Sequence, residues 1–195
     1  MRTFILTCAI LGLNRTNAQE TQNKYFFKEV GWSIILPADF NLVDASDDAA
    51  RNERGKKAME KANNVIADIS QTRTLISATK NTYNYFNATI TPFNPKEDGD
   101  YKFVNQQVKD IAYKTLFQKM PDAKIDSSTS IITIDGLVFD KYQLTIAIKN
   151  KVLFNMLLLT KFYKGFDFGI TYLYLDEKTK DEMETMLQNS KFSKQ

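Results

Sequence analysis

Residues 137–175 decide the fold, and they read LVFDKYQLTIAIKN (137–150), KVLFNMLLLTKFYKG (151–165) and FDFGITYLYL (166–175). Short polar turns at residues 149–151 and 164–165 divide the stretch into three apolar runs. In the third run, large apolar residues occupy alternate positions from Phe166 to Tyr174, which is typical of a strand with one buried face. The middle run is apolar on both faces, as in a strand that is covered on both sides. We therefore predict a three-stranded meander at the centre of the fold.

Four further strands are predicted before the meander, at residues 25–36, 72–80, 83–92 and 130–134. The first of them turns at Gly31 and ends at Pro37, because proline has no N–H group to donate to a neighbouring strand. The last leads into the meander through Asp135-Gly136, a dipeptide that is typical of tight hairpin turns. We therefore expect the sheet to be mainly antiparallel.

Three helices are predicted, at residues 46–68, 102–118 and 179–189. We expect Ser46 to cap the first helix, with Asp47 and Asp48 in its first turn, where the helix dipole favours negative charge. This helix is rich in charged residues, and it contains Gly55, which costs about 1 kcal/mol relative to alanine in a helix interior. We therefore expect a solvated helix.

The helix at residues 102–118 has the clearest amphipathic pattern in the chain. Its apolar face comprises Phe103, Val104, Val108, Ile111, Ala112, Thr115 and Leu116, and its polar face comprises Lys102, Gln106, Lys109, Asp110 and Lys114. The helix at residues 179–189 places Met183, Met186 and Leu187 on one side. We expect these two helices to cover the sheet, with the aromatic residues of 166–174 facing one of them.

The first 18 residues have the pattern of a secretory signal peptide. Arg2 gives a basic start, residues 4–13 are apolar, and the small residue Ala18 stands at the expected cleavage site. The apolar run is shorter than the roughly 20 residues that span a bilayer. We therefore predict one domain over residues 19–195, secreted to the periplasm or the cell envelope. Lipid attachment at Cys8 is the less favoured alternative, because Thr7 stands where such a site prefers glycine or alanine.

The composition restricts the chemistry that the chain can perform. It contains no histidine, and Cys8 is its only cysteine. A Ser–His–Asp triad, a Cys–His pair and an ordinary zinc site are therefore excluded. Acid–base catalysis near neutral pH would need a carboxyl or lysine group with a strongly shifted pKa. Without residues 1–18 the chain has 24 basic and 23 acidic residues, so its charge does not indicate nucleic-acid binding.

Two groups of aspartates are candidate Ca²⁺ ligands. The first group is Asp44, Asp47 and Asp48, and the second is Asp98 and Asp100. Helix capping explains the first group without a metal. The second group lacks the alternating oxygen ligands and the later glutamate of an EF-hand loop. We favour a structural role for both groups and expect no cofactor.

A set of aromatic residues forms the candidate binding surface: Tyr83, Tyr85, Phe86, Tyr172 and Tyr174. Tyrosine combines an apolar ring with a polar tip and is common at interfaces. Packing within the sheet is the competing interpretation, and it is favoured for most of them. Trp32 alternates with Ile34 and Leu36, so we interpret it as a core residue rather than a ligand platform.

The order of these elements resembles the PsbP-like superfamily. The resemblance spans residues 25–195 and rests on three motifs: Trp32-x-Ile34-x-Leu36-Pro37-x-x-Phe40, Asp135-Gly136 before the meander, and Ser190-Lys191-Phe192 after the last helix. The superfamily groups the extrinsic PsbP protein of photosystem II with a Ran-binding nuclear import factor and many secreted bacterial proteins. It implies an α+β fold, an α/β/α sandwich with a twisted, mainly antiparallel sheet and helices on both faces. The helical segment near residues 46–68 is longer than the usual connection in that family.

Two functions follow from these observations. The first is a secreted, non-catalytic domain that binds a protein or a small-molecule partner in the cell envelope and does not span the membrane. The absence of histidine, the signal peptide and the resemblance favour it, since described members are mainly binding and assembly proteins. The second is a hydrolase or lyase that uses carboxylates, lysines or a divalent cation. Two carboxylates converging in a pocket with an apolar wall would support the second function.

Overall fold

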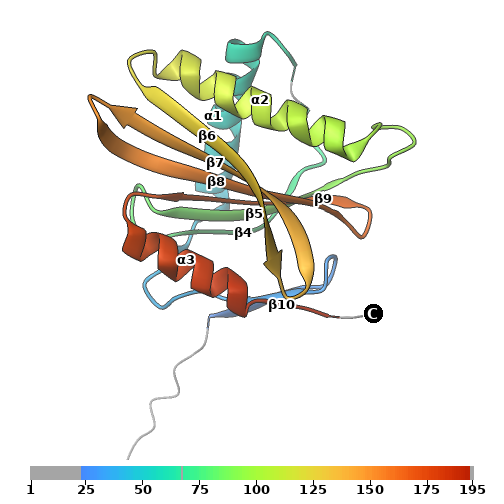
Figure 1. Cartoon of the computed structure of the whole chain (residues 1–195). Helices are drawn as coiled ribbons and strands as arrows, with labels where there is room; N and C mark the ends of the chain where they lie inside the picture. Colours follow the sequence, from blue (N-terminus) through green and yellow to red (C-terminus); the bar gives the residue numbers. More distant parts are fainter. Residues whose placement is uncertain (1–22, 67, 194–195) are drawn as a thin grey trace, which may run out of the picture.

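The computed structural model describes residues 23–66 and 68–193, so the predicted signal peptide and Cys8 lie outside the described residues. A seven-stranded sheet forms the middle layer, in the order β3-β4-β5-β9-β8-β7-β6, and all neighbouring strands are antiparallel. Its strands are β3 (Asn41–Leu42), β4 (Arg73–Thr79), β5 (Tyr85–Pro92), β6 (Lys124–Ile134), β7 (Leu137–Ile148), β8 (Lys151–Tyr163) and β9 (Phe166–Tyr174). Figure 1 shows helices on both faces of this sheet, which confirms the predicted α+β sandwich.

The predicted meander is the centre of this sheet. Strand β8 pairs with β7 on one side and with β9 on the other. Leu157 and Leu159 are fully buried on one face, whereas Met156 and Leu158 pack on the opposite face. Both faces of β8 are therefore covered, as the two-sided apolar pattern predicts.

The upper layer in Figure 1 consists of α1 (Ala45–Asn63) and α2 (Tyr101–Lys119). Together with Leu144 and Ile146 of β7, residues of α2 form the upper cluster of apolar side chains. None of the helices in the described ranges is long and apolar enough to cross a membrane.

Two details of the helix predictions are wrong. The N-cap of α1 is Asp44 rather than Ser46, because Asp44 is the residue with extended backbone before the first turn, and the helix ends at Asn63 because Asn64 adopts a left-handed conformation with φ 53°. In α2, Lys109 is buried and Phe103 is exposed, the reverse of their predicted placement. The helix is rotated about its axis because polar Asn105 also faces the sheet, where it bonds to side chains of β7 and β8.

The lower layer combines α3 (Glu177–Asn189) with a second, three-stranded sheet in the order β1-β2-β10. Its strands are β1 (Lys24–Phe27), β2 (Trp32–Ile35) and β10 (Lys191–Phe192), and it is an addition to the single sheet that the sequence predicts. The lower core lies between these elements and β9. The Trp32 ring is completely buried there, with ring centroids 5.4 Å from Phe168 and 6.3 Å from Phe192, which confirms its role as a core residue.

The turn at Gly31 holds the C-terminal end of the described chain. Gly31 has φ +63°, and its carbonyl oxygen accepts a hydrogen bond of 2.8 Å from the backbone N–H of Ser193. A side chain at this position would collide with the Ser193 side chain. Glycine is therefore required here both by its conformation and by the close approach of the C-terminal segment.

Candidate binding groove

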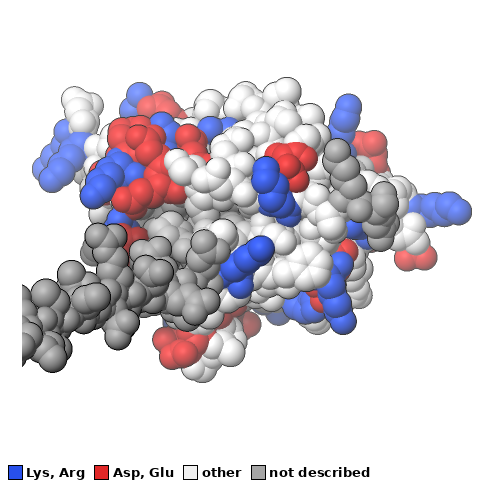
Figure 2. All heavy atoms as spheres, turned by 90° about the horizontal axis from the view of Figure 1, so that it is seen from below, with Lys and Arg blue, Asp and Glu red and all other residues white. Residues whose placement is uncertain are grey.

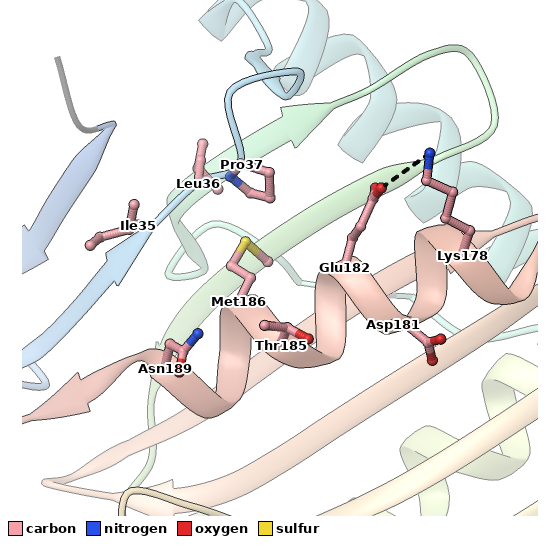
Figure 3. A pocket seen from close by; sticks show the side chains of 9 residues that line it. All are labelled: Ile35, Leu36, Pro37, Lys178, Asp181, Glu182, Thr185, Met186 and Asn189. Carbon is pink, nitrogen blue, oxygen red and sulfur yellow. Dashed lines mark ion pairs between the residues drawn. The ribbon is translucent and has the colours of Figure 1, made fainter. Parts of the chain in front are cut away.

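A groove of about 770 Å³ separates the end of β2 from α3 (Figure 3). It is lined by Ile35, Leu36, Pro37, Lys178, Asp181, Glu182, Thr185, Met186 and Asn189. The wall on the β2 side is apolar, whereas the α3 side carries charged and polar groups around Met186. Apolar contact area with a few polar groups is typical of binding sites in proteins.

Ile35 lies opposite Lys24 of β1, but on the other edge of β2 no strand of the described ranges pairs with it. Successive residues of a strand direct their N–H and C=O groups to opposite edges. The N–H of Leu36 donates to Asn23 on the β1 side, and the carbonyl of Gly31 accepts from Ser193 on the β10 side. The N–H and C=O groups of Ile35 therefore point toward the β10 side of β2. However, β10 pairs with β2 only as far as Ser33. Beyond Ser33, the described chain has α3 in place of a partner strand.

An ion-pair network fixes α3 beside this groove. The ammonium group of Lys80 lies 2.7 Å from the carboxylate of Asp39 and 2.6 Å from that of Glu182, and Lys178 approaches Glu182 at 4.0 Å. The hydrogen bonds that Lys80 donates to Asp39 and Glu182 raise the pKa of Lys80, and the one that Asp39 accepts lowers the pKa of Asp39. The network connects the residue after β4, the loop after β2 and α3, so it holds these three segments together.

The carboxylates of the groove are not arranged as a catalytic pair. Glu182 is engaged by Lys80 and Lys178, and Figure 3 shows the side chain of Asp181 pointing away from Glu182. An acid–base mechanism needs two such groups to reach one substrate from suitable positions. The groove is therefore better suited to binding than to carboxylate catalysis.

The outer face of the small sheet continues the apolar wall of the groove. The side chain of Ile35 is 46% exposed and that of Phe26, on the neighbouring strand, is 59% exposed. Figure 2 views the molecule from this side and shows uncharged surface interrupted by a few charged side chains. This surface has a signal in the sequence. Ile35 is apolar at an outward position of a strand whose buried face is Trp32, Ile34 and Leu36.

The predicted aromatic binding residues do not form one surface. Tyr83 is exposed in the connection from β4 to β5, whereas Phe86, Tyr172 and Tyr174 are buried in the lower core. Tyr85 lies on the opposite face of the sheet, where its hydroxyl accepts from Ser77 at 3.0 Å and donates to Asp48 at 3.3 Å. Four of the five predicted residues therefore pack within the protein: Tyr85, Phe86, Tyr172 and Tyr174. Tyr83 is the one that is exposed to a partner.

The candidate metal ligands are engaged in hydrogen bonds within the protein. Asp48 of α1 is buried and accepts from the Thr74 hydroxyl at 2.8 Å. Asp100 caps α2 by accepting from the Phe103 N–H at 2.9 Å, and Asp98 accepts from the Asn94 N–H at 2.7 Å. Asp44 and Asp47 lie at the start of α1. Within residues 23–66 and 68–193, no three acidic, histidine or cysteine side chains lie close enough together to hold a metal ion.

A polar cluster lies between α2 and the sheet. The Tyr101 hydroxyl donates to Asp167 of β9 at 2.7 Å, and the Asn105 amide donates to Asp140 of β7 at 2.9 Å. Burial raises the pKa of Asp167, and burial together with the Asp167 charge raises the pKa of Tyr101. Neither group lines the groove, so we assign the cluster to the attachment of α2.

Comparisons with known proteins support the fold. No family model matches the chain, and no curated protein matches it in sequence. Among solved structures it is similar to cyanobacterial PsbP (CyanoP) from Synechocystis sp. PCC 6803, with a TM-score of 0.57 and 11% identity over 97% of this chain and 99% of that one. A Bacteroides thetaiotaomicron protein gives a TM-score of 0.49 and 10% identity, over 89% of this chain and 49% of that one. The architecture and the CyanoP similarity together show that this chain has a PsbP-like fold.

Proposed function

We propose that this chain is a non-catalytic binding domain of the cell envelope, and that it binds an extended segment of a protein partner in the groove between β2 and α3. The observation that carries the proposal is the unpaired edge of β2 at Ile35, next to a groove of about 770 Å³ with an apolar wall. An extended segment that lies along this edge adds main-chain hydrogen bonds, and its side chains enter the groove. Location in the envelope rests on the predicted signal peptide.

The test uses variants that block the groove without disturbing the core. Ile35→Glu places a charge on the exposed apolar wall, and Thr185→Arg places a long side chain in the groove from the exposed face of α3. Ile131→Glu is the matched control, because Ile131 is an apolar residue of β6 that is 68% exposed and does not line the groove. We expect envelope proteins captured by the wild type to be lost with both groove variants and retained with the control.

Hydrogen exchange then checks the mode of binding. A partner segment that pairs with β2 protects the Ile35 amide, and NMR of methionines labelled with ¹³C in the methyl group reports contact with Met186. Capture that is equal for wild type, Ile35→Glu and Thr185→Arg would contradict the proposal, as would a bound partner that leaves the Ile35 amide unprotected.

A further inference from the structure

A second apolar pocket, of about 310 Å³, lies in the upper layer between α1, α2 and β8. Its lining includes Met59 of α1, Met156 and Leu158 of β8, and a row of mainly apolar residues of α2. The one hydroxyl in the lining belongs to Thr115, which donates to the carbonyl of Ile111 and accepts from the side chain of Asn63. The pocket therefore offers apolar contacts to a ligand. Two of its lining residues are methionines, whose flexible side chains adapt to different ligands.

Gly55 forms part of the wall on the α1 side. It lies within the helix, where glycine is unfavourable, and it does not have the positive φ that would require glycine. A Cβ atom at this position would meet nothing within 4 Å. Neither the backbone nor the packing of α1 accounts for this glycine. Its effect is to leave space between the two helices.

Helix α2, which supplies one uncharged wall of the pocket, has more basic than acidic residues elsewhere on its surface. The helix has four lysines, Lys102, Lys109, Lys114 and Lys119, and Asp110 is its single acidic residue. No ion pair among the described residues involves a lysine of α2. Lys114 follows Ile111 by three positions, so the two are neighbours on the helix surface, and Ile111 lines the pocket. A ligand with an apolar body and a negatively charged end matches this arrangement.

We propose that this pocket binds a fatty acid, with the acyl chain between α1, α2 and β8 and the carboxylate beside Lys114. Its volume of about 310 Å³ accommodates about ten methylene-sized groups, at the roughly 30 Å³ that a water molecule occupies in the liquid. The pocket is lined by none of the groove residues and lies on the other face of the sheet, so the assignment stands independently of the proposed protein partner.

The experiment uses decanoate as the probe and protein labelled with ¹³C in the methionine methyl groups. We expect decanoate to shift the signals of Met59 and Met156 and to leave those of Met183 and Met186, in the lower layer, unchanged. Gly55→Leu fills the pocket and should weaken binding at least tenfold without lowering the melting temperature, because the new side chain enters open space. Gly55→Ala is the matched control and should retain binding.

The charged end is tested separately. Lys114→Gln should weaken decanoate binding about two- to fivefold, as expected for an exposed ion pair, and should leave binding of the neutral analogue 1-decanol unchanged. Lys102→Gln, on the same helix but outside the pocket lining, should change neither. Three results would overturn the assignment of decanoate to this pocket. They are the absence of shifts at Met59 and Met156, equal shifts at these two and at Met183 and Met186, and undiminished binding by Gly55→Leu. Equal affinity of Lys114→Gln and the wild type for decanoate would overturn the assignment to a carboxylate.

Discussion

At the scale of single residues, the aspartates show how a side chain that suggests a ligand site serves the fold. Asp48 is 7% exposed, and its carboxylate accepts hydrogen bonds from Asn52, Thr74 and Tyr85. These donors come from α1, β4 and β5, so one carboxylate attaches the helix to two strands. A buried charge with several donors is stable because hydrogen bonds replace the water that it loses.

Asp48→Ala should therefore destabilise the protein by about 2–3 kcal/mol, since it leaves the Thr74 and Tyr85 hydroxyls without their acceptor. Asp47→Ala, its exposed neighbour in the same turn, should cost under about 1 kcal/mol, because it removes only an interaction with the helix dipole. Urea unfolding followed by circular dichroism measures both. Equal costs, or a melting temperature that rises with Ca²⁺ in the wild type alone, would instead favour a metal role for these residues.

Asp167 provides a prediction about pH. Burial raises its pKa above the ordinary 3.8, so the folded protein holds this proton more tightly than the unfolded chain does. The stabilising contribution of protonated Asp167 is complete below pH 3.8 and is lost as the pH rises through the raised value. Asp167→Asn keeps an oxygen acceptor for Tyr101 and carries no charge.

We expect Asp167→Asn to equal the wild type in stability at pH 3 and to become relatively more stable as the pH rises toward 7. Urea unfolding of both proteins at each pH provides the measurement. If the free energy of unfolding of the wild type instead rose relative to that of the variant as the pH rises, the prediction would be wrong. The hydrogen bond from Tyr101 to the charged carboxylate would then outweigh the cost of burial.

At the scale of elements, the strands could be predicted far better than the faces of the helices. Alternation in β9 and two-sided apolarity in β8 depend on local sequence, and both strands are found where the pattern places them. The buried face of α2 depends on what the sheet presents to it. Asp140 and Thr160 bond to Asn105, and this polar contact rotates the helix so that Lys109 is buried. No periodicity within residues 101–119 contains that information.

Two glycines with open space around them should respond in opposite directions to substitution by alanine. Gly55 is helical, so Gly55→Ala should stabilise the protein by about 0.5–1 kcal/mol through reduced freedom of the unfolded chain. Gly136 has φ +83° in the turn between β6 and β7, so Gly136→Ala should destabilise it by about 1 kcal/mol. Thermal unfolding of both variants provides the comparison. A change of the same sign would mean that backbone conformation is not the cause.

At the scale of the whole molecule, the two apolar clusters share one sheet, and this should make them unfold together. Leu144 belongs to the upper cluster and Trp32 to the lower core. Leu144→Ala should cost about 2–5 kcal/mol, as for other buried leucines. We expect tryptophan fluorescence and circular dichroism to show the same reduced urea midpoint. A fluorescence transition that keeps the wild-type midpoint would reveal two independently unfolding halves.

The main sheet and its three helices could be predicted from the sequence, but the small sheet and the groove could not. Local sequence patterns and the resemblance to PsbP-like proteins predict the order of strands and helices. The groove depends on how residues 35–37 and 178–189 are placed against each other, and on where β10 stops pairing with β2. Ile35 alone, as an outward apolar residue, indicates that something contacts this side of the strand.

The pairing of β2 with β10 has a consequence for the timing of synthesis. Strand β2 is made early, but its partner β10 and the helix α3 are among the last segments of the described chain to leave the ribosome. Contacts between segments so far apart in sequence form late. The β2–α3 groove therefore does not exist on a nascent chain, and a partner that recognises it meets only molecules whose translation has passed residue 192. Recognition at this surface would therefore report that β10 and α3 have joined β2.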